Sequence, residues 1–202
     1  SSDLFLPAQS VGELLWNFTE AQLVKYYEDH ANDPNEQLWH RFLLRCLLPY
    51  LAYRMEEHGD FFLAYRRRSN PDFNFQMLLE EAFVELNRAE LTDVFPDFAG
   101  KRTLLGLGEL PDLDAREQRA RRVREYLVEK LTLLVLEKDE LRFLHQNFRD
   151  FFAACHLLNM ADMGIDAPYW TTRTLPIYLR RMLGQIEGEH HYDPQKVLAA
   201  AP

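Results

Sequence analysis

A histidine at the start of an aromatic-rich segment is the residue of this chain best placed to do chemistry. Phe143-Leu144-His145 ends a short apolar run. The segment that begins at Gln146 has the spacing of an amphipathic helix, which predicts that Phe151 and Phe152 are buried. An imidazole held at such a junction can donate a hydrogen bond to an anion outside the segment. It can equally cap the following helix or satisfy a carbonyl of the preceding hairpin. The residues alone leave both roles of His145 open.

The chain lacks a complete phosphate-binding loop. Such a loop needs Gly-x-x-x-x-Gly-Lys-(Ser/Thr), in which backbone N–H groups and the lysine hold the phosphates. The nearest match is Gly100-Lys101-Arg102, but Phe95 stands in place of the leading glycine and Arg102 in place of the Ser or Thr. No apolar run of strand type ends in the paired acids that would hold magnesium. We therefore expect that this chain is not an enzyme and hydrolyses no nucleotide by itself.

Arginines are concentrated in one predicted helix. In a DNA-binding winged helix, this helix would lie in the major groove, and Arg119, Arg122 and Arg124 would contact the nucleic acid. The same helix carries acidic residues, and the formal net charge of the chain is −9. Phosphate contacts require a basic surface, so nucleic-acid binding is the less favoured interpretation. A solvated face or an interface between domains is the alternative.

Metal and nucleophile sites have little support in the sequence. His190 and His191 are adjacent, and adjacent side chains point to opposite sides of a helix or a strand, so a shared metal is not expected. Cys46 and Cys155 lie on apolar helical faces without metal-ligand spacing, which is typical of reduced core thiols in a cytosolic protein. No apolar run is long enough to span a membrane, and no signal peptide is evident. We expect a cytoplasmic protein without a membrane partner.

The pattern of apolar residues predicts a mainly α-helical fold. Ser10 and Glu13 form a capping box for a helix over about 10–30, and Asp33 caps a second helix that Pro49 should kink and Gly59 should end. A third helix is expected over about 74–91 and a fourth over about 114–130. Two apolar runs around the charged residues 137–140 predict a single β-hairpin, and a helix over about 146–160 follows. Further helices are expected within 164–202, near 174–187 and 194–200.

The junction resembles the winged-helix subdomain of NACHT-type signalling NTPases of the STAND class. The shared pattern is Phe-x-His followed by an acidic residue and Phe-Phe-Ala-Ala, here Phe143, His145 and the run from Asp150 to Ala154. Arg149 departs from the glutamine usual in that family, whereas Asp150 keeps the acidic character. The resemblance implies a helical subdomain at 1–93, a connector at 94–111, a winged helix at 112–163 and the start of a further helical region at 164–202.

The same resemblance implies a regulatory role. His145 would contact the β-phosphate of a diphosphate held by a nucleotide-binding domain that is absent from this chain, and so stabilise the resting state. The chain alone would bind no cofactor, whereas the parent protein would bind ATP or ADP with magnesium. Its partner would be that nucleotide-binding domain, with oligomerisation on activation. A DNA-binding winged-helix regulator and a plain helical scaffold for protein interactions are the alternatives.

Overall fold

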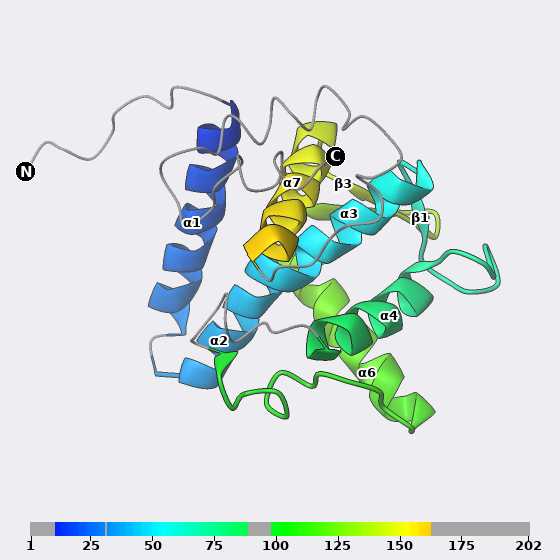
Figure 1. The fold of residues 1–202 in the computed structure, drawn as a ribbon, viewed down its shortest axis with the longest axis horizontal. Helices are drawn as coiled ribbons and strands as arrows, with labels where there is room; N and C mark the ends of the chain where they lie inside the picture. Colours follow the sequence, from blue (N-terminus) through cyan, green and yellow to red (C-terminus); the bar gives the residue numbers. More distant parts are fainter. Residues whose placement is uncertain (1–10, 31, 89–97, 163–202) are drawn as a thin grey trace, which may run out of the picture.

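The described residues form helices that pack on one another, with one small antiparallel sheet to the side of α3 and α7 (Figure 1). The computed structural model describes residues 11–30, 32–88 and 98–162. The elements in these ranges are α1 (Val11–Asp29), α2 (Pro34–Phe42), η1 (Leu43–Leu47), α3 (Leu48–His58), β1 (Leu63–Ala64), α4 (Phe75–Arg88), α6 (Leu113–Arg124), η3 (Glu125–Lys130), β2 (Leu134–Glu137), β3 (Glu140–Phe143) and α7 (Gln146–Asp162). The mainly helical class expected from the sequence is confirmed. The helices expected near 174–187 and 194–200 lie outside the described residues.

The helix predicted from Asp33 to Gly59 forms with the expected caps. The Asp33 carboxylate accepts hydrogen bonds from the N–H groups of the first turn, and Gly59 ends α3 with a left-handed φ of 81°. Between α2 and α3 the chain widens into the π-helical turn η1, in which the N–H of Leu48 bonds to the carbonyl of Leu43. Pro49 follows directly. A proline cannot supply an N–H to the preceding turn, so the irregularity expected there takes the form of a π turn.

The expected hairpin is β2–β3, and its turn is tighter than the sequence indicated. Glu137 pairs with Glu140, so the loop shrinks from four charged residues to the two residues Lys138 and Asp139. Both have positive φ angles, 50° and 73°. Two-residue hairpin turns of type I′ have positive φ at both central positions. They are favoured because the twist of the turn matches the right-handed twist of the flanking strands.

A third strand, which sequence analysis missed, completes the sheet. In β1, Leu63 pairs with Leu141 and Ala64 pairs with Glu140, giving the strand order β1–β3–β2. Two residues are too few to show an alternating pattern, so this strand carries no local signal. The pairing places the segment after α3 beside the strand that leads to His145. The expectation of one isolated hairpin was therefore incomplete.

One hydrophobic core spans both sides of the connector expected at 94–111. The Phe42 ring lies 5.8 Å from that of Phe83 and 6.0 Å from that of Phe98, measured between centroids. α7 lies across α3 (Figure 1), and Phe151 and Phe152, predicted to be buried, are each 1% exposed. Each large ring removed from water contributes a few kcal/mol. This packing fixes where α7 begins, and thereby where His145 stands.

Candidate functional site

His145 lies exposed at the junction between β3 and α7. On one side, Phe143 is buried and the N–H of Leu144 bonds to the carbonyl of Leu133 at 3.0 Å, which extends the hairpin. On the other side, Nδ1 of His145 accepts a hydrogen bond from the N–H of Asn147 at 3.1 Å. The ring therefore caps α7, as one of the two interpretations proposed.

The cap also decides which nitrogen of His145 is available to a ligand. Because Nδ1 uses its lone pair to accept the N–H of Asn147, a neutral ring must carry its hydrogen on Nε2. Nε2 has no hydrogen-bond partner among the residues that the structure describes. Its N–H is thus a donor to whatever approaches this face. Capping and anion contact use different nitrogens, so the two roles are compatible.

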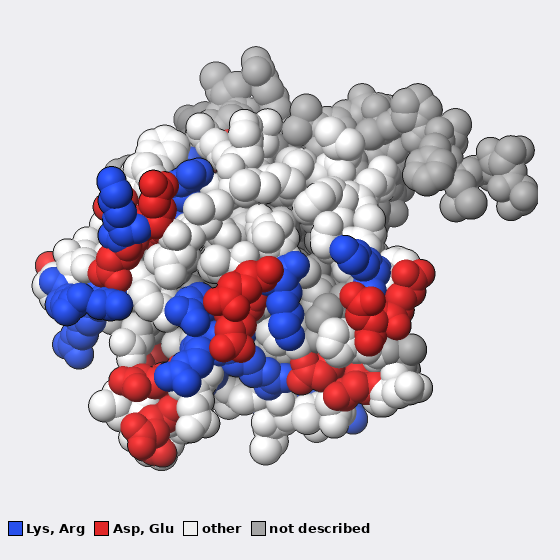
Figure 2. All heavy atoms as spheres, turned by 180° about the vertical axis from the view of Figure 1, so that it is seen from behind, with Lys and Arg blue, Asp and Glu red and all other residues white. Residues whose placement is uncertain are grey.

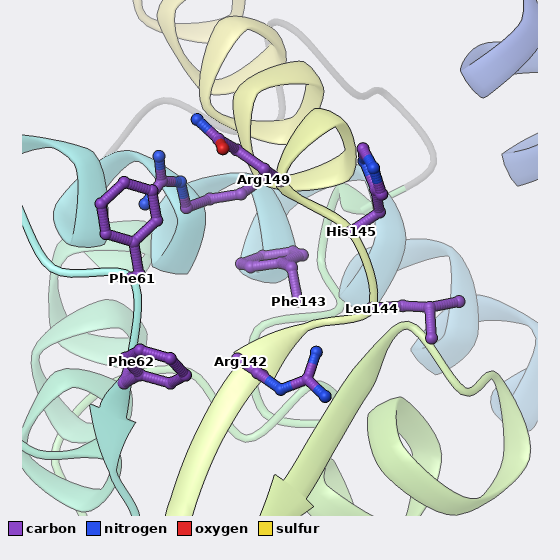
Figure 3. A pocket seen from close by; sticks show the side chains of 8 residues that line it. Phe61, Phe62, Arg142, Phe143, Leu144, His145 and Arg149 are labelled. Atoms are coloured by element: carbon purple, nitrogen blue, oxygen red, sulfur yellow. The ribbon is translucent and has the colours of Figure 1, made fainter.

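A pocket of about 290 Å³ lies beside this histidine (Figure 3). In Figure 3, Phe61 and Phe62 stand on one side, Leu144 and His145 on the other, and Phe143 lies between them. None of the described side chains that line the pocket is a carboxylate; they are Phe61, Phe62, Arg142, Phe143, Leu144, His145, Gln146 and Arg149. In a chain with 32 acidic residues against 23 basic ones, such a lining favours a negatively charged partner.

Exposed apolar side chains surround the cations of this pocket. Phe61 is 55% exposed, Phe62 51% and Leu144 48%. Arg142 lies next to them on β3 and forms no ion pair with any described residue. Large apolar side chains gathered on one face can serve to contact another protein or domain. The pocket therefore combines an apolar contact surface with donors for an anion.

Arg149 lines the pocket and is held by a buried ionic cluster. Its guanidinium lies 2.8 Å from a carboxylate oxygen of Glu56 and 3.5 Å from one of Asp150, and it donates to the carbonyl of Asp60 at 3.2 Å. It also lies 4.4 Å from the centre of the Phe61 ring, toward which it extends in Figure 3. Arg149 thus links α3, α7 and the Phe61 side of the pocket.

Asp150 makes the stability of this cluster depend on pH. Burial, and then the hydrogen bond and charge of Glu56, raise the pKa of Asp150 from 3.8 to about 7, while Arg149 opposes the shift. The folded chain therefore holds more protons than the unfolded chain between these two values. The free energy of unfolding should fall as pH rises through that window, by on the order of 1–3 kcal/mol from this group. Urea unfolding of wild type and Asp150→Asn at several pH values measures it. The variant should lose this part of the slope, and an unchanged slope would contradict the assignment.

The three arginines named for DNA contact are used inside the fold. Arg119 is 8% exposed and donates to the carbonyls of Gly106 and Gly108 at 2.8 and 3.1 Å. Arg122 pairs with Glu36 at 2.6 Å, and its guanidinium lies 4.3 Å from the centre of the Trp39 ring. Arg124 lies 3.7 Å from Glu129 and above the ring of Tyr65. On the face of the molecule that Figure 2 shows, acidic and basic side chains are interspersed and form no basic stripe. The structure thus gives these arginines internal partners.

Reactive thiols, metal sites and membrane-spanning helices have little support in the described part of the chain. Cys46 and Cys155 are buried free thiols, and burial raises the pKa of each. Within residues 11–30, 32–88 and 98–162, no group of three or more side chains is arranged to hold a metal ion. No helix in those ranges is both apolar and long enough to traverse a lipid bilayer. His190 and His191 lie outside them.

Neither protein-family models, nor curated proteins, nor solved structures give a match to this chain.

Proposed function

We propose that this chain is a regulatory piece of a NACHT-type nucleotide-dependent switch, and that its His145 face packs on a nucleotide-binding domain in the resting state. The observation that carries the proposal is the exposed His145 ring: its cap leaves Nε2 unused, and it lines a pocket whose described residues include no carboxylate. A diphosphate on the partner domain is the anion that such a donor suits. Phe61, Phe62 and Leu144 supply apolar contact area around it.

The order of the elements supports a winged-helix subdomain. α3 is followed by the short strand β1, then by the helices α4 and α6, and finally by the β2–β3 hairpin as the wing. In the sheet order β1–β3–β2, the strand β1 pairs with β3, so the hairpin that would form the wing is joined to the segment that follows α3. On this proposal the winged helix includes α3, β1 and α4 in addition to the expected range 112–163.

The energetics of the switch follow from differential binding. A diphosphate can bias the equilibrium only by the contacts that it makes in the closed state and loses in the open one. One hydrogen bond to a charged group contributes roughly 1.5–3 kcal/mol. Loss of the His145 contact should therefore raise the population of the open state by about tenfold or more.

The test is His145→Leu in the full-length parent protein. We expect basal oligomer formation to rise by about tenfold or more and the affinity for diphosphate to fall in parallel. Size-exclusion chromatography with light scattering measures the first, and calorimetric titration with ADP measures the second. An unchanged oligomer state together with unchanged affinity for ADP would remove His145 from the mechanism.

His145→Asn is the matched control for the cap. Asparagine can still accept the N–H of Asn147, because Asn is a good N-cap residue, but its side chain is shorter than the imidazole. In the isolated chain, His145→Asn should unfold at nearly the wild-type urea concentration, whereas His145→Leu should lose about 1 kcal/mol. In the full-length protein both variants should raise basal oligomer formation. If only His145→Leu does so, the effect comes from the lost cap.

A further inference from the structure

A second pocket, of about 220 Å³, lies between the β1–α4 connection and α6. Its lining combines Arg66 and Arg67 from the connection with Arg121 from α6, and Gln76 contributes a side-chain amide from the first turn of α4. Glu117 is the one carboxylate among the described residues that line it. None of these residues lines the His145 pocket.

Two of the arginines have no ion-pair partner among the described residues. Arg66 lies 3.2 Å from Asp139 at the hairpin turn and is engaged there. Arg67 and Arg121 are exposed, and neither forms a hydrogen bond or an ion pair with any residue that the structure describes. They come from segments more than 50 positions apart in the sequence and line the same pocket. Figure 2 shows basic side chains gathered at the left edge, where the β1–α4 connection projects in that view.

The start of α4 adds further attraction for an anion. Phe75 and Gln76, the first two residues of this helix of 14, line the pocket. Asn74 caps the helix by accepting the N–H of Met77 at 3.0 Å. Free N–H groups in a first helical turn carry partial positive charge, and they favour anions within reach of that turn. Two guanidinium groups that have no ion-pair partner among the described residues therefore line the same cavity as the start of α4.

We propose that this pocket binds a phosphoryl group of a small molecule, inorganic pyrophosphate being the simplest ligand of this kind. Guanidinium groups form paired, charge-assisted hydrogen bonds to phosphate oxygens, and two arginines from different segments surround one phosphoryl group better than they follow an extended strand. A nucleic-acid backbone is disfavoured by the net charge of −9 and by Glu117 at the pocket edge. The inference goes beyond the proposed switch function, because neither His145 nor a partner domain enters it.

The experiment is calorimetric titration of the full chain with inorganic pyrophosphate and with inorganic phosphate at low ionic strength. We expect saturable binding of pyrophosphate, and at least about tenfold weaker binding in Arg67→Gln/Arg121→Gln, since two charge-assisted hydrogen-bond donors are lost. Arg68→Gln/Lys101→Gln is the matched control, because it removes the same charge from exposed positions that line neither this pocket nor the His145 pocket. Its affinity should stay within about twofold of wild type.

Each outcome is decisive. Equal weakening in both double variants would show a general charge effect and overturn the proposal. Absence of pyrophosphate binding in the wild-type chain would overturn it as well. If the chain binds a DNA duplex but no pyrophosphate, and the Arg67→Gln/Arg121→Gln variant loses the DNA binding, then the ligand of this surface is nucleic acid and the proposal is wrong. None of these results bears on the proposed switch, which is tested by oligomer formation and ADP affinity of His145→Leu in the full-length protein.

Discussion

Replacing Arg149 by methionine should lower the free energy of unfolding by about 3–5 kcal/mol, because it removes one partner of a buried ionic cluster. The Arg149 and Glu56 side chains are 6% and 9% exposed and lie 2.8 Å apart. Without the guanidinium, the carboxylates of Glu56 and Asp150 stay buried but lose the cation that pairs with both of them. Urea unfolding at neutral pH measures the loss.

A triple variant separates the buried charge from lost packing. Glu56→Gln/Arg149→Met/Asp150→Asn removes the cation and both carboxylates, so most of the stability should return. Arg142→Met is the control for removing an arginine from the same pocket, and it should change the free energy of unfolding by less than about 0.5 kcal/mol. A loss in Arg149→Met no larger than that of the control would show that the cluster does not stabilise the fold.

Arg119→Met should destabilise the chain by about 2–4 kcal/mol, since Arg119 donates to two loop carbonyls and hydrogen bonds from charged groups are among the stronger ones. These carbonyls belong to Gly106 and Gly108, which have φ angles of 66° and 96°. The guanidinium also lies 4.1 Å from the centre of the Phe83 ring. Few residues other than glycine adopt such φ angles. In this loop conformation the two glycine carbonyls accept hydrogen bonds from Arg119, and both bonds are lost in the variant.

The control for Arg119 is its exposed neighbour Arg121 on the same helix. Arg121→Met should leave the free energy of unfolding within about 0.5 kcal/mol of wild type. Thermal and urea unfolding of the two variants can be compared directly. If Arg119→Met proved as stable as Arg121→Met, Arg119 would not be needed for the stability of the fold. It would then again be a candidate for contact with DNA.

Local signals in the sequence predicted the helices well. Asp33 and Gly59 set both ends of the helix that comprises α2, η1 and α3, because caps act on their immediate backbone neighbours. The buried positions of Phe151 and Phe152 followed from helical periodicity alone. The hairpin was predicted, but its turn was not: the positive φ angles of Lys138 and Asp139 come from strand twist, and this pair is not the Asn-Gly type that signals such a turn.

The candidate site was half predictable. The order of residues placed His145 at a strand–helix junction, and the structure put the ring on the surface, capping α7 through Nδ1. Phe61, Phe62 and Arg142 were missed as its neighbours. Their approach depends on the pairing of β1 with β3, and a strand of two residues leaves no periodic trace. A pair of adjacent phenylalanines after a predicted helix end was the one signal that could have pointed to an exposed apolar surface.

Charge was the property that the sequence determined least. The composition gave a net charge of −9 and a run of arginines, but it could not say which arginines are neutralised. Arg119 donates to two carbonyls and Arg122 pairs with a carboxylate, whereas Arg67 and Arg121 line a shared pocket and form no ion pair with any described residue. Helix ends and buried faces depend on residues within a few positions of each other, so the sequence by itself determined them. Ion pairs and pockets join segments that lie far apart in the chain, and only the tertiary structure decided those.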